Sequence, residues 1–437
     1  MRRTLCIPFR VLPLVLAALA LLCSCGNGGG NSGGNARFRM LNASTGYTSL
    51  DVYSNDQNKD DDDAQRFSAV SYGTLSDYAS LAAATYTLEF RRAGASTSLL
   101  SVASQAMAED SNATYVTYGS TGHFNVYKIS DDVADADSGK AKVTVINVSE
   151  AGNLDVYFTD ENIALSDTSP QISAVGSGGS LGATVNSATY RMRVTGAGDN
   201  TDIRLDVSGI VFNSKQVASI VLTPTPGGVL VNALLLPQQG SVTAYANTKA
   251  RVRGAVGISN GTKATIVIGG TTLLSNSTVG IISNTYQQVT AASLPVSVLV
   301  DGVAATVPNK TLVAGSDYTV LVWNDSSGTQ ASLVSDDNRA PEVTGNVKIR
   351  LMNGMSALAG PISYTVNFSP TADDIAVGAA SGYSEISGGS DFQIDVKDAL
   401  TSAPIFSRTG VSLTGSAVYT MFMYSGATPS ATLRRDR

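Results

Sequence analysis

The chain has 437 residues, of which only 15% are charged, and its formal net charge is −6 at pH 7. A chain of this length exceeds what one hydrophobic core can organise, so we expect several domains. The acidic balance argues against a general electrostatic attraction to phosphates, and we therefore expect no nucleic-acid partner.

Residues 1–24 have the pattern of a signal peptide. Arg2 and Arg3 give a positive beginning, and an apolar run follows from Val11 to Leu22. The run is too short to stay in a bilayer as a spanning helix, and its place at the N-terminus is typical of a secretion signal.

The end of this segment, Leu22-Cys23-Ser24-Cys25, resembles the lipobox of bacterial lipoproteins. The resemblance implies cleavage before Cys25 and acylation of its sulfur. Acyl chains, at about 0.8 kcal/mol per buried CH₂ group, would then hold the protein at a membrane. An ordinary secretory signal that contains two cysteines is the alternative. The chain has only three cysteines, so cleavage would leave Cys25 alone and no disulfide.

Residues 25–35 are rich in glycine and asparagine and predict a flexible tether. The lipoprotein resemblance implies a cell-envelope location. In enterobacterial lipoproteins an aspartate after the lipidated cysteine retains the protein in the inner membrane. Here Gly26 stands at that position, which favours the outer membrane, with the protein facing the periplasm or the cell surface.

Four diverged copies of one β-rich unit fill the chain after the tether. We place them at residues 36–130, 141–240, 241–335 and 346–437, and each has about the length of a β-sandwich domain. A copy opens with a strand in which basic or polar residues alternate with apolar ones, as at residues 347–351 (VKIRL). This alternation predicts a strand with one face in water.

Further strands follow in each copy at intervals of about 8–12 residues, separated by turns rich in Gly, Ser, Asn and Asp. The second strand reads L-D-V-Y in the first two copies, at residues 50–53 and 154–157. No long stretch with helical periodicity follows the N-terminus. The predicted fold class is all-β, with four tandem antiparallel β-sandwich repeats after a lipoprotein signal peptide.

These motifs resemble the bacterial envelope domain catalogued as domain of unknown function 4397. The resemblance rests on the N-A-S at residues 42–44, the L-D-V-Y strand, the G-x-x-x-x-Y bend at 73–78, the YTLEF strand at 86–90 and the closing run at 318–323. Copies one and two match well and copy four in part, whereas copy three lacks the asparagine and L-D-V-Y. The resemblance implies Ig-like sandwiches and an extracytoplasmic location, and it transfers no activity and no site residues.

Two acidic segments, residues 130–139 and 335–342, are predicted to be short structureless linkers. The boundary between copies two and three is less sharply marked. A short strand at residues 242–245 fits either copy, and we begin the third copy at residue 241.

No catalytic constellation stands out. His123 is the only histidine, so it cannot belong to a multi-histidine metal site. A Ser–His–Asp triad is arithmetically possible, but a turn or strand-edge histidine is the favoured interpretation. Residues 178–182 (GGSLG) match G-x-S-x-G, yet they lie at a glycine-rich bend rather than in the strand–turn–helix of a nucleophile elbow. We predict no catalytic residues and no cofactor.

Two acidic stretches carry enough carboxylates to suggest calcium, residues 60–63 and the pair Asp135 and Asp137. The second fails the EF-hand spacing, because Ile146 stands where the closing glutamate would be. Solvated acidic loops are the favoured interpretation, so we predict no metal site. Copy one is also rich in tyrosines, which suit either packing or a platform for a glycan or protein. These are Tyr47, Tyr53, Tyr72, Tyr78, Tyr86, Tyr115, Tyr118 and Tyr127.

We predict a non-enzymatic, lipid-anchored cell-envelope protein whose tandem sandwiches act as a binding, adhesion or spacer module. Its partners would be the membrane, through Cys25, and a protein or glycan ligand. The alternative is a glycan-acting enzyme or a carbohydrate-binding accessory protein. Such an enzyme needs paired carboxylates about 5–10 Å apart. Asp51 and Asp155 are candidates, but they recur in equivalent strands, whereas an active site usually occurs once.

Overall fold

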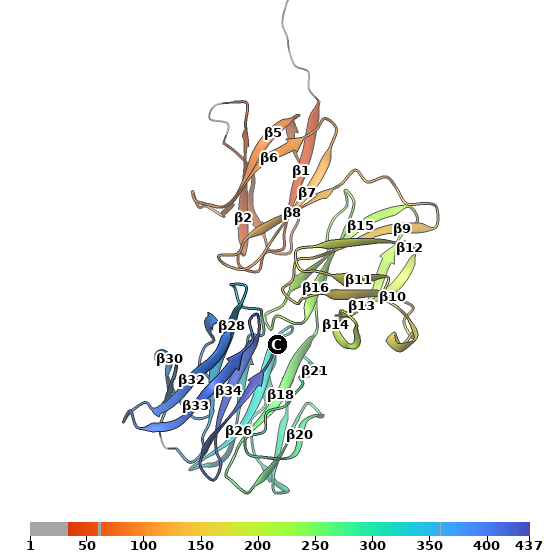
Figure 1. Cartoon of the computed structure of the whole chain (residues 1–437). Helices are drawn as coiled ribbons and strands as arrows, with labels where there is room; N and C mark the ends of the chain where they lie inside the picture. The colour runs from red at the N-terminus through yellow and green to blue at the C-terminus, as the bar shows by residue number, and fades with distance from the viewer. Residues whose placement is uncertain (1–33, 60–62, 359) are drawn as a thin grey trace, which may run out of the picture.

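The computed structural model describes residues 34–59, 63–358 and 360–437 (Figure 1). Within these ranges the fold is all-β, as predicted, and the one helical element is a single 3₁₀ turn, η1 (Leu165–Asp167). None of the described helical structure is long and apolar enough to cross a membrane. The predicted signal peptide and Cys25 lie outside the described residues.

The strands form four two-sheet sandwiches in tandem. We call them D1 (residues 35–131), D2 (140–245), D3 (249–336) and D4 (346–436). In Figure 1 the chain passes from D1 at the top, through D2 at the right, to D3 and D4 side by side at the bottom.

D1 shows the shared topology in its simplest form. One sheet has the order β4-β1-β7-β8 and the other the order β3-β2-β5-β6. The first contains β1 (Asn35–Asn42), β4 (Ala79–Ala82), β7 (Asn112–Tyr118) and β8 (Asn125–Ser130). The second contains β2 (Ser49–Asp56), β3 (Ala64–Ser71), β5 (Ala84–Arg92) and β6 (Ser98–Met107). Opening strand β1 and closing strand β7 pair in parallel, whereas the other neighbours are antiparallel. The sandwich is therefore not purely antiparallel, because the intervening strands act as a long crossover.

D2, D3 and D4 repeat this arrangement. The sheets of D2 are β12 (Ser180–Asn186), β9 (Lys140–Asn147), β15 (Gln216–Pro224), β16 (Val231–Pro237) and β17 (Thr243–Tyr245), and β11 (Ile172–Val175), β10 (Leu154–Thr159), β13 (Ala188–Gly196) and β14 (Asp199–Phe212). Those of D3 are β21 (Gln287–Thr290), β18 (Lys249–Gly257), β26 (Asp317–Asp325) and β27 (Gly328–Asp336), and β20 (Thr271–Thr278), β19 (Lys263–Ile268), β23 (Val296–Val300) and β24 (Val303–Ala305), with a small sheet of β22 (Ser293–Leu294) and β25 (Lys310–Thr311). Those of D4 are β31 (Ser384–Ser387), β28 (Asn346–Gly354), β34 (Val418–Ser425) and β35 (Pro429–Arg435), and β30 (Ser369–Ile375), β29 (Ile362–Val366), β32 (Gly389–Asp398) and β33 (Pro404–Leu413).

Each sandwich has its own hydrophobic core between its two sheets. In D1 the ring of Phe38 on β1 lies 5.0 Å from that of Phe67 and 5.9 Å from that of Tyr115, in edge-to-face contacts. Leu50 and Val52 of the L-D-V-Y strand are fully buried in the same core. The period-2 alternation thus directs every second residue of the motif inward.

The other face of the opening and closing strands is also buried, because the sandwiches pack in pairs, D1 with D2 and D3 with D4. At each interface the two parallel strand pairs contribute apolar residues that are cross-strand neighbours. In D1·D2 these are Leu41, Val116, Ile146 and Val221. In D3·D4 they are Ala255, Leu321, Met352 and Phe422. The prediction that these strands present one face to water is therefore wrong.

The structure also places two segments differently from the sequence-based expectation. β17 pairs with β16, so residues 243–245 complete the sheet of D2 and the third sandwich begins later than residue 241. The segments predicted to be structureless linkers each have a buried aspartate as their second residue, since Asp131 is 1% exposed and Asp336 is 3% exposed. Both side chains belong to the interfaces described next.

Candidate functional site between the first two sandwiches

Three of the four sandwiches carry the same four polar residue types, a quartet of arginine, tyrosine, threonine and aspartate, beside the interface. In D1, Arg39 Nε donates to Thr114 Oγ1 at 2.8 Å. Asp131 Oδ2 accepts from Thr114 Oγ1 at 2.6 Å and from the Tyr78 hydroxyl at 2.6 Å. The guanidinium of Arg39 also lies 4.6 Å from the centre of the Tyr78 ring, a cation–π contact. The counterparts in D3 are Arg253, Tyr286, Thr319 and Asp336, and those in D4 are Arg350, Tyr383, Thr420 and Asp436. D4 differs in one contact, because the Tyr383 hydroxyl is buried without a hydrogen-bond partner among the described residues.

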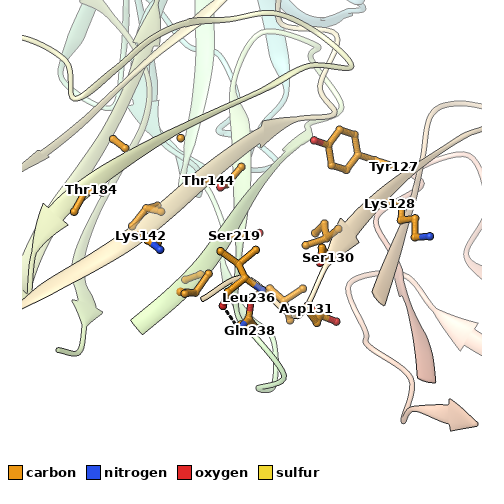
Figure 2. A pocket seen from close by; sticks show the side chains of 17 residues that line it. Tyr127, Lys128, Ser130, Asp131, Lys142, Thr144, Thr184, Ser219, Leu236 and Gln238 are labelled. Atoms are coloured by element: carbon orange, nitrogen blue, oxygen red, sulfur yellow. Dashed lines mark hydrogen bonds between the residues drawn. The ribbon is translucent and has the colours of Figure 1, made fainter. Parts of the chain in front are cut away.

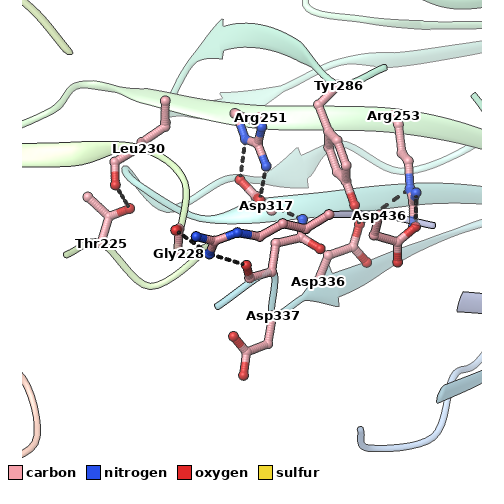
Figure 3. A network of polar contacts seen from close by, with 12 residues as sticks. Thr225, Gly228, Leu230, Arg251, Arg253, Tyr286, Asp317, Asp336, Asp337 and Asp436 are labelled. Carbon is pink, nitrogen blue, oxygen red and sulfur yellow. Dashed lines mark hydrogen bonds and ion pairs between the residues drawn. The ribbon is translucent and has the colours of Figure 1, made fainter. Parts of the chain in front are cut away.

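In the D3·D4 pair, arginine and aspartate are exchanged across the interface, and Figure 3 shows one of the two pairs, Arg253 with Asp436. Arg253 of D3 pairs with Asp436 of D4, with Nη1 and Oδ1 2.5 Å apart. Arg350 Nη2 of D4 pairs with Asp336 Oδ1 of D3, and Arg350 Nη1 donates to the Ser335 carbonyl at 2.8 Å. The four ionised side chains are at most 1% exposed. Two reciprocal buried ion pairs therefore join D3 to D4.

The protonation states in this network follow from its charges. Burial by itself would raise the pKa of Asp336, but the guanidiniums of Arg350 and Arg253 outweigh burial and hold the pKa below its ordinary value. Burial, together with the nearby Asp336 carboxylate, raises the pKa of Tyr286 well above its ordinary value. At neutral pH the aspartate is thus an ionised acceptor and the tyrosine a neutral donor.

D2 has lost this quartet. The strand registers place Thr144 where the other sandwiches have arginine, Gly182 where they have tyrosine, Ser219 for threonine and Gln238 for aspartate. The Gln238 amide is turned to the backbone of Val133, to which it makes two hydrogen bonds of 2.9 Å. An arginine and a tyrosine fill the corresponding space in D4, so this space is open in D2.

A cleft of about 470 Å³ lies at this place, between D1 and D2 (Figure 2). Residues from Tyr127 to Asp131 line it on the D1 side. Thr144, Ser219 and Leu236 line it on the D2 side, together with neighbours on the same sheet. In the described part of the chain the hydroxyls of Thr144 and Ser219 have no hydrogen-bond partner, although Ser219 is only 8% exposed. The cleft thus combines apolar walls with free polar groups, as ligand sites do.

The buried charge in the wall is Asp131, whose side chain is 2% exposed. Its Oδ2 accepts the bonds of the quartet, whereas its Oδ1 accepts none from any described residue. Two lysines also line the cleft but are engaged elsewhere. Lys142 Nζ donates to the Ala134 carbonyl at 2.8 Å, and Lys128 Nζ lies 5.6 Å from the Tyr115 ring.

The carboxylates considered for glycan hydrolysis are taken up by the backbone. Asp51 accepts from the amides of Ala69, at 2.7 Å, and Gly94, at 2.9 Å. Asp155 accepts from the equivalent amides of D2 at the same two distances. Each aspartate fixes a bulge and a turn within its own sandwich, and the structure does not bring the two together.

The other sequence candidates are dispersed. His123 Nε2 lies 3.5 Å from Glu342 Oε2, and Ser180 of the G-x-S-x-G match shares a 2.6 Å hydrogen bond with the Tyr127 hydroxyl. No group of three potential metal ligands occurs among the described residues, which include Asp135 and Asp137. Residues 60–62 of the first acidic stretch lie outside them.

The tyrosines of D1 do not form one exposed platform. Tyr47, Tyr86 and Tyr115 are buried in the core, and Tyr78 belongs to the quartet. Tyr118 and Tyr127 pack against the D1·D2 interface, whereas Tyr72 is 39% exposed. Packing thus accounts for most of these rings, as their recurrence among the copies suggests.

The family model described as "Domain of unknown function (DUF4397)" matches residues 36–157. This match confirms the resemblance for D1 and the first strands of D2. No curated protein matches the chain.

Several solved structures share weak likeness with the chain, and two of them illustrate it. One is described as a family CBM26 module of Eubacterium rectale Amy13K in complex with maltoheptaose, with 12% identity and a TM-score of 0.17, covering 48% of this chain and 96% of that one. The other is the Bacillus anthracis TIE protein, with 8% identity and a TM-score of 0.14, covering 91% of this chain and 68% of that one. Because both TM-scores are very low, neither likeness bears on what this chain binds.

Sequence reasoning missed the quartet and the cleft. One signal was visible: the opening strands carry Arg39, Arg253 and Arg350 at one position, where the second copy has Thr144. The aspartates were hidden because they stand in segments whose composition is typical of solvated linkers. The cleft beside Thr144 becomes visible only when D1 and D2 are seen packed together.

Proposed function

We propose that this protein is a non-enzymatic, lipid-anchored component of the cell envelope, and that its sandwich pairs hold a ligand-binding cleft between D1 and D2. The observation that carries the proposal is the open cleft itself. In D1, D3 and D4 the repeated arginines and aspartates serve the fold, and in D2 their loss leaves a space with free polar groups.

The lipobox supports the anchor. Acylated Cys25 would stand ten residues before β1 begins at Asn35. Ten residues reach at most about 35 Å, so D1 and the cleft would lie close to the membrane, with D3 and D4 further along the chain. Gly26 supports an outer-membrane location.

Fractionation of cells that express the wild type, Cys25→Ala or Cys23→Ala tests the anchor. We expect Cys25→Ala to leave the membrane fraction, because acyl chains would supply the membrane affinity. Cys23→Ala is the matched control and should stay with the membrane, since it keeps the modified residue. Protease treatment of intact cells then separates a surface from a periplasmic location. Membrane retention of Cys25→Ala equal to that of the wild type would rule out the anchor.

A further inference from the structure

The two interfaces of the molecule are built on the same positions, which makes them comparable residue by residue. Leu41 and Val116 of D1 correspond to Ala255 and Leu321 of D3, and the residues of D2 correspond to those of D4 in the same way. Asp131 therefore faces the place of Thr144 as Asp336 faces Arg350.

In the D3·D4 pair the Arg350 guanidinium is held by three acceptors. These are Asp336 Oδ1, the Ser335 carbonyl at 2.8 Å and the Thr420 hydroxyl at 3.0 Å. The counterparts in the D1·D2 pair are Asp131, Ser130 and Ser219, and all three line the cleft. The D1·D2 pair thus keeps the acceptors but lacks the arginine that uses them.

We propose that the D1·D2 cleft binds a guanidinium group carried by a ligand, held by Asp131 Oδ1, the Ser130 carbonyl and the Ser219 hydroxyl. This inference rests on the binding role proposed above and names its ligand chemistry. Gly182 leaves free the space that a tyrosine ring fills in D4, and this opening admits the ligand.

The physical reason is the state of Asp131. A carboxylate that is almost wholly buried is costly unless its acceptor positions are used. Arg39 Nε lies 3.5 Å from Asp131 Oδ2 and pairs with that oxygen, but in the described chain Oδ1 has no donor. A guanidinium supplies donors in the planar geometry that suits a carboxylate. Lys142 and Lys128 also line the cleft, but their ammonium groups are turned to the contacts given above rather than to Asp131 Oδ1 as acceptor.

Calorimetric titration of the full-length protein in detergent micelles, with agmatine as the probe, tests this assignment. We expect agmatine to bind. Citrulline, which matches arginine except for an uncharged ureido group in place of the guanidinium, should bind at least about tenfold more weakly than arginine, because a charge-assisted hydrogen bond contributes about 1.5–3 kcal/mol. An acetylated and amidated Gly-Arg-Gly peptide and free arginine form two further arms. Tighter binding of the peptide would point to a protein partner, and tighter binding of agmatine or arginine to a small molecule.

Two variants make the test specific. Thr144→Arg supplies the missing guanidinium from the chain itself, so it should abolish agmatine binding and raise the melting temperature. Thr144→Met adds similar bulk without charge and should not raise the melting temperature in the same way. Asp131→Asn should also abolish binding, and Thr144→Arg keeps the proposal testable if that variant does not fold.

Absence of agmatine binding to the wild type, equal binding of citrulline and arginine, or unchanged agmatine binding to Thr144→Arg would each overturn the proposal. The titration uses purified protein, and the anchor is tested in cells. Failure of the guanidinium site is therefore distinguishable from failure of the envelope role.

Discussion

At the scale of single residues, the arginine of the opening strand stabilises the fold where it is present, and its absence in D2 opens the cleft. Arg253 and Arg350 each form a buried ion pair across the interface. Arg39 pairs with Asp131 of its own sandwich, at 3.5 Å, but across the interface it meets the Gly240 carbonyl, at 2.5 Å, and no carboxylate. Among the described residues its Nη2 atom is buried without a partner. Because D2 has Thr144 in place of an arginine, Asp131 Oδ1 of D1 is an acceptor without a donor in the described chain. Because D2 has Gln238 in place of an aspartate, Arg39 Nη2 is a donor without an acceptor there.

Asp336→Asn should destabilise the D3·D4 pair strongly. The substitution keeps the shape of the side chain but leaves Arg350 buried without its counter-charge, and breaking a buried pair on one side costs about 3–5 kcal/mol. Urea unfolding followed by tryptophan fluorescence measures this, since Trp323 lies in D3 at the interface. Asp391→Asn, at an exposed position of D4, is the matched control and should change the free energy of unfolding by less than about 0.5 kcal/mol. An equal effect of the two substitutions would show that the ion pair adds no stability.

At the scale of elements, the sequence predicts strands better than it predicts what covers them. The alternation at residues 347–351 identifies β28 and its inward face, because Val347 and Ile349 are core residues. It fails for the opposite face, because Lys348 and Arg350 are charged and yet 8% and 1% exposed. Charge in an alternating strand normally indicates solvent. Here the neighbouring sandwich supplies the counter-charges, which no pattern within one copy contains.

Phe422→Ala should weaken the D3·D4 interface without removing the core of D4. Phe422 is fully buried in the interface cluster, and truncating a buried phenylalanine costs about 3–5 kcal/mol. Phe368→Ala in the same sandwich is the control, since that ring is 74% exposed. Small-angle scattering should show a larger radius for Phe422→Ala, with far-ultraviolet circular dichroism unchanged. If the two variants scattered alike, the interface would not depend on this contact.

At the scale of the whole molecule, the last residue joins the two sandwich pairs. The Arg437 guanidinium donates to the carbonyls of Glu150 and Gly228 in D2 and of Asn338 between D3 and D4. Burial, more than the nearby positive charges, lowers its pKa to about 10. Figure 1 accordingly places the C-terminus near the centre of the molecule. The sequence alone suggests no role for residues 434–437. The contacts of Arg437 join it to residues that lie 99 to 287 positions away in the chain, and such distant contacts produce no local sequence pattern.

Acid should loosen this assembly from the D3·D4 side. Hydrogen bonds and charge from Arg339 and Lys348 outweigh the effect of burial and lower the pKa of Asp337 to about 2, and the pKa of Asp336 is also lowered. Their pKa values in the unfolded chain are about 3.9, so the unfolded state binds protons first as the pH falls. The stability contributed by these carboxylates is therefore complete above about pH 4 and is lost as the pH falls toward 2. Urea unfolding between pH 7 and pH 2 should show this decline, and Asp337→Asn should show a shallower one because it has one such group fewer. An identical pH dependence in the variant would mean that Asp337 has the same pKa in the folded and unfolded states, and that its contacts with Arg339 and Lys348 do not stabilise the junction.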